Sequence, residues 1–317
     1  MSSPLRNTYC LYFALTLWSV LTLSPSLKAA DPTSPEEPGE VLVTVDGQSI
    51  TQADLAFATL SRGISSAPPA ARKQLLEGLI NQRLIKTFLD QHKVTVPPQV
   101  LDESVLKVEK LIRRKGDDPE QILSKMGYTS EKLREDIALP LAWNIYCRRE
   151  ITPAAMQKYF NSHREELDGT RVEASHILLK LSPDAAPADI KSATEKLSQI
   201  RSEVQSGKLT FAEAAEKYSE APSKMEGGKL VTSAYRGKMP LALTQRVFPL
   251  RPGEISEPFQ TPFGVHLITL NKKHPGQFSL EDVRGEIYQI LSRQLYDQTI
   301  KQLRSQAKIE WKSDSVQ

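Results

Sequence analysis

The sequence predicts an α+β protein with a mainly helical N-terminal part, a mixed domain and a long C-terminal helix. Apolar residues at helical spacing dominate residues 41–165. Residues 171–272 instead alternate strands with helices, beginning with a β-rich segment at 171–180. From Ser279 onward the apolar residues again follow one helical face. This apolar stripe needs a partner, so we expect residues 279–311 to form a helix that packs on the N-terminal domain.

The N-terminal domain begins with a small strand and continues as helices. Residues 41–45 are rich in β-forming side chains, Asp46-Gly47 is a turn signal, and Thr51 is the predicted N-cap of a helix starting at Gln52. Helical spacing then predicts helices from Leu75 to Leu89 and around Leu101 to Ile112, and over residues 118–125, 130–150 and 152–163.

The mixed domain carries its signals in a different order. Strands are predicted at 171–180 and 265–270, with helices at 188–207 and 211–219 between them. Because the composition changes so clearly after residue 165, we expect this segment to fold as a domain of its own.

The first thirty residues resemble a targeting segment. Arg6 precedes a long apolar stretch, and small residues follow near Ala30, so residues 1–30 are predicted to be a signal peptide. The alternative is an uncleaved membrane anchor, because the stretch from Tyr9 to Leu27 could nearly span a bilayer. Residues 31–40 contain three prolines and are predicted to be an extended linker. Export would make the protein periplasmic or secreted.

Composition and charge exclude several classes of protein. The chain has 317 residues, of which 39% are hydrophobic and 25% charged, which is typical of globular proteins. Cleavage after Ala30 removes Arg6 and Lys28 from 41 basic side chains, leaving 39 against 38 acidic ones, a formal +1. This balance argues against nucleic acid as a partner. Cys147 would be the single remaining cysteine, so no intrachain disulfide is expected.

Common catalytic motifs are missing from the sequence. It contains no phosphate-binding loop, no dinucleotide fingerprint, no zinc-protease motif and no nucleophile elbow. The five histidines lack the spacing of a metal site, so neither a metal nor a cofactor is expected. His176 and His266 differ from the others because each lies within a predicted strand. Paired strands would place them side by side, and from spacing alone they could be two core histidines that satisfy each other's hydrogen bonds.

Residues 171–272 resemble the parvulin family of peptidyl-prolyl isomerases, and six motifs in the family's order carry the resemblance. They are Ala174-Ser-His-Ile-Leu178, Phe211-Ala212 with Ala215 and Ser219, Gly227-Gly228-x-Leu230, Arg236-Gly237-x-Met239, Phe248-x-Leu250-x-Pro252-Gly253-Glu254-Ile255-Ser256, and Thr261-x-Phe263-Gly264-x-His266.

The resemblance implies both a fold and a site. The fold would be the FKBP-like one, a four-stranded antiparallel sheet with helices. The catalytic residues would be His176, His266 and Thr261, with the two histidines beneath the substrate pocket. The apolar wall that receives the proline ring would be formed by Leu230, Met239, Leu243, Phe248 and Phe263.

Three positions depart from the family pattern. Ala221 stands where the family usually has Asp or Cys facing the substrate amide, Val231 follows Leu230 where glycine is usual, and Leu243 aligns with a phenylalanine of the proline pocket. The activity is therefore expected to be weaker than in other parvulins. The loop at 182–187 lacks a basic pair, so no preference for phosphoserine-proline is expected.

The remaining residues resemble the SurA/PrsA type of exported foldase. The motifs are Val45-Asp-Gly47 with Ile50-Thr51, Leu79-Ile-Asn-Gln-Arg-Leu-Ile85, and Met126-Gly-Tyr128 with Leu133 and Ile151-Thr152. This resemblance implies an exported isomerase and chaperone that binds unfolded or proline-containing polypeptides, with outer-membrane proteins as candidate clients. The alternative is a non-catalytic chaperone whose degenerate parvulin domain only binds peptides.

Overall fold

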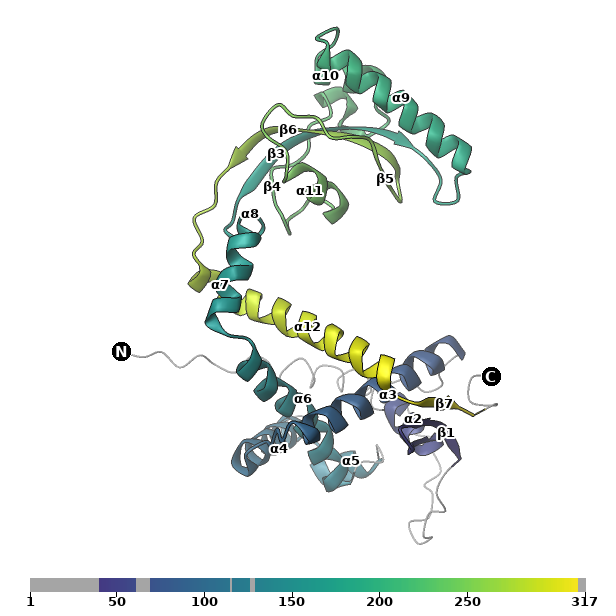
Figure 1. Ribbon diagram of the computed structural model, residues 1–317, viewed down its shortest axis with the longest axis vertical. Coiled ribbons are helices and arrows are strands. Elements are labelled where there is room, and N and C mark those ends of the chain that lie inside the picture. The colour runs from purple at the N-terminus through teal and green to yellow at the C-terminus, as the bar shows by residue number, and fades with distance from the viewer. Residues whose placement is uncertain (1–39, 61–68, 115, 126–128, 313–317) are drawn as a thin grey trace. The chain divides into compact units, whose positions relative to one another are not determined.

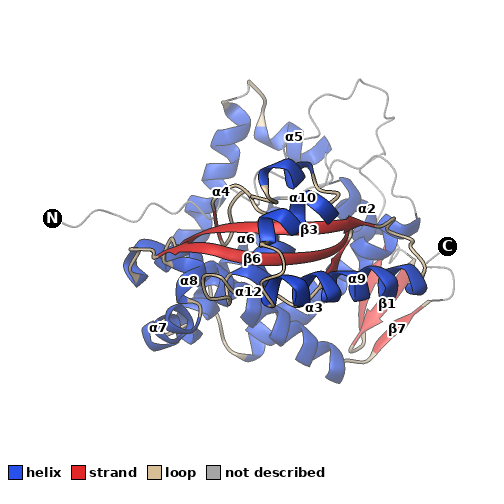
Figure 2. Ribbon diagram, turned by 90° about the horizontal axis from the view of Figure 1, so that it is seen from above, coloured by secondary structure: helices blue, strands red, loops and turns tan. Residues whose placement is uncertain are grey.

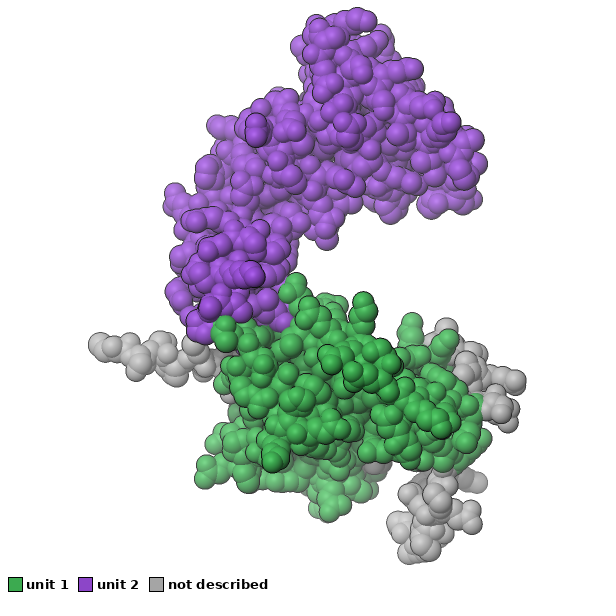
Figure 3. All heavy atoms as spheres, viewed as in Figure 1, with its two compact units in different colours: residues 1–152, 292–317 green, residues 153–291 purple. Residues whose placement is uncertain are grey.

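The computed structural model describes residues 40–60, 69–114, 116–125 and 129–312. The predicted signal peptide and all of the predicted linker except Glu40 lie outside the described residues. The chain divides into two compact units (Figure 3), unit 1 with residues 1–152 and 292–317 and unit 2 with residues 153–291.

Unit 1 contains a small antiparallel sheet that pairs an N-terminal hairpin with a strand from the C-terminal part of the chain. Strands β1 (Val41–Val45) and β2 (Gln48–Thr51) form a hairpin, and β7 (Ile309–Trp311) pairs with the other edge of β1. The predicted turn at Asp46-Gly47 is confirmed, because both residues have positive φ angles of 51° and 81°. Two consecutive positive φ angles are typical of the two-residue turn that suits hairpin twist.

Among the described residues, five helices follow in the N-terminal part of unit 1 (Figure 1). They are α2 (Gln52–Leu60), α3 (Pro69–Gln91), α4 (Pro98–Arg113), α5 (Pro119–Lys125) and α6 (Ser130–Glu150). The side chain of Thr129 caps α6 by accepting a hydrogen bond from the backbone N–H of Lys132 at 3.1 Å. The buried core of unit 1 comes mainly from β1 and α3, with fully buried Leu76 and Ile80 at its centre.

Helix α12 (Leu280–Gln306) contributes residues to both units. Its C-terminal half, together with the strand β7 after it, belongs to unit 1, where Ile300 is 9% exposed and lies in the same core cluster as Leu76. The guanidinium of Arg304 donates to Glu77 Oε2 at 2.6 Å and to Asn81 Oδ1 at 2.7 Å on α3. The prediction extended the helix to residue 311, but it ends at Gln306, because residues 309–311 pair with β1 instead.

Unit 2 is built around a four-stranded antiparallel sheet with the strand order β4-β3-β6-β5. Figure 2 shows the two long central strands β3 and β6 from above. The strands are β3 (Arg171–Lys180), β4 (Ser233–Ala234), β5 (Phe259–Thr261) and β6 (Gly264–His274). The helices are α7 (Pro153–Ser162), α8 (Arg164–Leu167), α9 (Pro187–Gln205), α10 (Phe211–Tyr218), the 3-10 turn η3 (Pro222–Glu226) and α11 (Leu241–Val247).

The two faces of this sheet carry separate cores. Figure 1 shows α9 and α10 on the convex side and α11 on the concave side. Alternate residues of β3 and β6 point to opposite faces. Ile177 and Leu267 accordingly pack with α9 and α10, whereas Ala174 and Ile268 pack beneath α11. The α+β class and the four-stranded antiparallel sheet predicted from the sequence are confirmed.

The divisions between the units do not coincide with the predicted domain limits. Contacts within the chain place α7 and α8 with unit 2, whereas the predicted helical domain extends to residue 165. The division at residues 291 and 292 also falls inside the predicted C-terminal helix. Met156 and Phe160 are buried and give α7 an apolar side. The packing of this side decides to which unit α7 belongs, and helical propensity does not. The predicted domain limits themselves stay a prediction.

Candidate active site

Two histidines meet on the concave face of the unit 2 sheet. In the register of β3 and β6, His176 stands opposite Ile268 and His266 opposite Leu178, so the histidines are diagonal neighbours on one face. Their ring centroids are 5.5 Å apart, and their Nδ1 atoms are 3.4 Å apart. The strands thus bring the two imidazoles together, displaced from a directly opposed pair.

Thr261 at the end of β5 extends this contact into a chain of hydrogen bonds. Its Oγ1 accepts the backbone N–H of Phe263 at 3.1 Å and lies 2.8 Å from Nε2 of His266. The same hydroxyl lies 3.5 Å from the carbonyl oxygen of Gly264, which can accept its proton. The contact between the Nδ1 atoms extends the chain from His266 to His176. A neutral imidazole carries one N–H, so the tautomer of each ring sets which group donates in each contact.

Burial keeps both imidazoles uncharged near neutral pH. His176 is 8% exposed and His266 is 3% exposed. Burial lowers the pKa of His176 below its ordinary value of 6.5. Burial, reinforced by the nearby His176, lowers the pKa of His266 to about 4. An imidazolium here would lose its hydration without gaining a carboxylate partner.

An apolar wall stands beside the histidines on the same face. Buried Met239 and Leu243 pack with Phe259 in the core beneath α11, and Leu230 packs against them from the segment before β4. Phe263, in the turn between β5 and β6, is 65% exposed, and its backbone carbonyl accepts the N–H of Leu181 at 3.3 Å. Phe263 is thus exposed at the β5–β6 turn, whereas Met239, Leu243 and Phe259 are buried and Leu230 is partly buried.

Phe248 belongs to the same buried cluster as Met239 and Leu243. Its side chain is 3% exposed and packs edge-on against Tyr235, with ring centroids 5.0 Å apart. Its carbonyl accepts a hydrogen bond from Lys273 Nζ at 2.7 Å. Phe248 therefore packs in the same buried core as Met239 and Leu243, and its predicted contact with the substrate stays a prediction.

Ser219 and Ala221 form a bend between α10 and η3 that the backbone of β3 holds in place. Ser219 Oγ accepts the N–H groups of Leu178 and Ala221, both at 3.2 Å. Ala221 is 5% exposed, so its methyl group is enclosed. The site therefore has no carboxylate and no thiol at position 221.

Phe259 is a site residue that sequence reasoning missed. Its ring stacks on His266 with centroids 5.6 Å apart and an angle of 20° between the rings. The signal was present in the sequence, because Phe259 and Thr261 are two residues apart and a strand places such residues on one face. A strand of three residues is too short for its alternation to be noticed.

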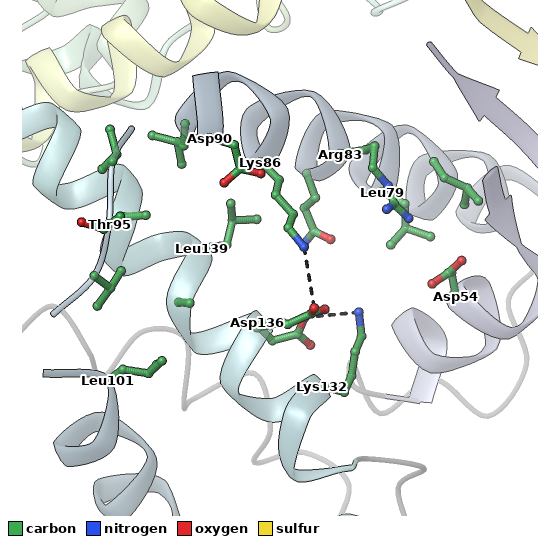
Figure 4. Close-up of a pocket in the computed structure, with 18 residues that line it drawn as sticks. Asp54, Leu79, Arg83, Lys86, Asp90, Thr95, Leu101, Lys132, Asp136 and Leu139 are labelled. Atoms are coloured by element: carbon green, nitrogen blue, oxygen red, sulfur yellow. Dashed lines mark ion pairs between the residues drawn. The ribbon is translucent and has the colours of Figure 1, made fainter. Parts of the chain in front are cut away.

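Unit 1 contains a cavity of about 500 Å³ between α3 and α6 (Figure 4). Its mouth carries an ion pair between the two helices, Lys86 Nζ to Glu135 Oε1 at 3.7 Å, and a second pair within α6, Lys132 Nζ to Asp136 Oδ1 at 3.6 Å. Apolar side chains also line the cavity, among them Leu79, Leu89, Val94, Val96, Leu101, Leu139 and Ala142. The sequence pattern gave no indication of this cavity.

Residues 40–60, 69–114, 116–125 and 129–312 bring no three His, Cys, Asp or Glu side chains close enough to hold a metal ion. Within the same ranges, no helix combines the length and the apolar character that a membrane crossing requires.

Comparison with known proteins identifies the class. Residues 176–272 match the family model of the rotamase PPIC-type PPIase domain. Unit 2 thus contains a peptidyl-prolyl cis-trans isomerase domain of the parvulin type, in agreement with its sheet, and the chain is such an isomerase.

Most of the chain is similar to foldases of the SurA and PrsA type. It is 27% identical over 293 residues to a putative peptidyl-prolyl cis-trans isomerase SurA from Haemophilus influenzae, covering 86% of this chain and 90% of the relative. It is also 27% identical over 238 residues to the foldase protein PrsA of Staphylococcus aureus, covering 73% of this chain and 67% of the relative. The crystal structure of PrsA from Bacillus cereus aligns with a TM-score of 0.48 at 22% identity, covering 88% of this chain and 96% of that one.

The buried histidines predict an unusual pH dependence. We expect kcat/KM for a proline peptide to stay level from about pH 6.5 to about pH 8, because the pKa values of both imidazoles lie below this range. His266 has a pKa near 4 in the fold against 6.5 when unfolded, so the unfolded chain binds more protons between these values. The stability of unit 2 should therefore fall by up to about 3 kcal/mol as the pH drops through that window. Urea unfolding and peptide turnover across this pH range measure both effects. An activity step near pH 6.5 would contradict a neutral, buried pair.

Proposed function

We propose that the concave face of unit 2 is where the chain catalyses rotation of X-Pro bonds. The observation that carries the proposal is the buried pair His176 and His266, joined to Thr261 at 2.8 Å, beside the wall of Met239 and Leu243. The substrate's proline ring would lie against this wall, and Phe263 would cover it from the rim.

The chemistry requires a shaped site and no nucleophile. Rotation of an X-Pro bond crosses a barrier of about 18 to 20 kcal/mol, because twisting removes the resonance of the amide. A site lowers this barrier by binding the twisted amide better than either planar isomer. In the proposed mechanism the wall holds the ring while the rest of the peptide turns, and water is kept from the ring. The hydrogen-bonded imidazoles hold the floor of the pocket in one shape and stay uncharged.

The absence of a polar side chain at position 221 is expected to lower the rate of isomerisation. A carboxylate or thiol at this position would face the substrate amide in other parvulins, as the sequence resemblance implies. Here the enclosed methyl group of Ala221 cannot interact with the developing charge of the twisted amide. The proposed site therefore acts through shape and through its fixed dipoles, and its turnover is expected to be modest.

Proline-limited refolding of a model substrate by the protein without residues 1–30 tests the catalytic proposal. We expect the slow phase to accelerate with protein concentration. Met239→Ala should reduce this effect about tenfold, because it removes the part of the wall that binds the ring. Phe263→Ala should also reduce it, and that side chain is 65% exposed, so its removal leaves the fold intact.

The matched control is Met225→Ala. It makes the same chemical change at a methionine of η3 that is 79% exposed and outside the wall. Equal losses for Met225→Ala and Met239→Ala, or no acceleration by the unmodified chain, would remove the proposed site. Binding of proline peptides without any acceleration would favour the non-catalytic alternative.

We also propose that the protein works after export and holds unfolded polypeptides, including outer-membrane proteins, on unit 1. The apolar leader at residues 1–30 supports export, and the similarity to foldases supports the holding role. The cavity between α3 and α6 has an apolar floor suited to side chains of an extended polypeptide. Cell fractionation tests export, and suppression of aggregation of an unfolded outer-membrane protein tests holding.

A further inference from the structure

An arginine borders the isomerase site and is separated from the histidines by one aromatic ring. Arg246 lies on α11, and its guanidinium carbon is 5.5 Å from the centroid of the Phe259 ring. The same ring stacks on His266 at 5.6 Å. A guanidinium over an aromatic face is held by attraction to the ring, while its N–H groups stay available to an acceptor beside the ring.

The segment around the site is strongly basic. Residues 222–247 contain five cationic side chains, Lys224, Lys229, Arg236, Lys238 and Arg246, against the single carboxylate of Glu226. Arg236 is paired with Glu286. Among the residues that the structure describes, no carboxylate lies within ion-pair distance of Arg246.

The floor of the site does not offset this charge. Both histidines are buried and uncharged, and position 221 carries a methyl group where a carboxylate could have stood. A peptide that enters the site beside Phe259 therefore meets the cation of Arg246 and an uncharged floor. Such a field favours substrates with negative charge close to the proline.

We propose that Arg246 selects polypeptide segments in which an aspartate or glutamate lies within two residues of the isomerised proline. The inference rests on the proposed function, since the proline must bind on the concave face. A carboxylate can accept two parallel N–H groups from one guanidinium, which gives a directional contact as well as charge. The cation on Phe259 is positioned before the peptide arrives, so little side-chain freedom is lost on binding. Arg246 acts here as a specificity residue and takes no part in the rotation.

Two peptide series test this selectivity. Each series varies one residue among Glu, Gln, Lys and Ala, either immediately before or immediately after the proline, and kcat/KM is measured at low salt. We expect Glu to exceed Lys by about three-fold in at least one series, the size of an exposed ion pair. Each variant is normalised to its own Ala peptide. The ratio of kcat/KM for the Glu peptide to that for the Lys peptide should approach one in Arg246→Gln and should persist in Arg246→Lys. Added salt should weaken the preference for Glu.

The control is Arg251→Gln, which removes one exposed cation just after α11 and should leave the Glu-to-Lys ratio unchanged. Equal ratios in the unmodified chain and in Arg246→Gln would overturn the inference, and so would an equal loss in Arg251→Gln. The Ala peptide separates the two proposals: without turnover of any peptide the proposed function fails. The dissociation constants of the Glu and Lys peptides then decide the inference, because equal affinities would refute it.

Discussion

Replacing Gly228 by alanine is expected to destabilise unit 2 by at least about 3 kcal/mol, a cost reached only by substitutions that disturb buried structure. Gly228 has a φ of +75°, and its carbonyl accepts the backbone N–H of His176 at 2.8 Å. A Cβ on this glycine would lie 2.3 Å from the carbonyl oxygen of His176. The strand carrying His176 would have to move away, so isomerase activity should fall together with stability.

The control for this substitution is Gly207, which has the same φ of +75° and has no other atom within 4 Å of the place that an added Cβ would occupy. Gly207→Ala therefore carries only the strain of the left-handed backbone, about 1 kcal/mol. Urea unfolding of unit 2 measures the difference between the two variants, and peptide turnover measures the effect on the site. Similar costs for both substitutions would show that close contact at Gly228 does not control the position of β3.

Removing the C-terminal half of α12 should unfold unit 1 and leave unit 2 active. Deletion of residues 292–317 takes away Ile300 from the core of unit 1, the contacts of Arg304 with α3, and the strand that pairs with β1. We expect the cooperative melting of unit 1 and its suppression of aggregation to be lost. Turnover of a proline peptide should persist, because no residue of the proposed site lies in the deleted segment.

A single substitution in α12 tests the same packing with a smaller loss of stability. Ile300→Ala should cost unit 1 about 2 to 4 kcal/mol, as expected for a buried aliphatic side chain. Lys301→Ala is the control, since this neighbouring side chain is exposed and its loss should change the melting temperature little. An unchanged melting temperature of unit 1 in Ile300→Ala would contradict the packing of α12 against β1 and α3.

Long, periodic elements were predictable from the sequence because their own patterns specify them. The helix predicted over residues 130–150 coincides with α6, and the strand predicted at 171–180 coincides with β3. The short strands β4, β5 and β7 have two or three residues each and carry no pattern of their own. They exist because a neighbouring strand offers free N–H and C=O groups, which is a property of the folded chain.

The arrangement of the site was only partly predictable for the same reason. A resemblance identified His176, His266 and Thr261, and the structure brings the three together. The diagonal offset of the two histidines depends on the register of β3 and β6, which no tight turn fixes, because the helices and loops of unit 2 separate these strands. Phe259 and Arg246 lie beside the histidines because β5 and α11 pack there. Such packing has no sequence motif from which it could be predicted.

The first and last residues of the central strands have a consequence for how such a chain can change over evolutionary time. Arg171, where β3 begins, pairs with His274, where β6 ends. Just outside them, the carbonyl of Asp168 accepts the N–H of Phe278 at 2.9 Å. The chain therefore enters the sheet domain and leaves it at adjacent points. One insertion or excision at this position could add, duplicate or delete an isomerase without changing the path of the helices on either side.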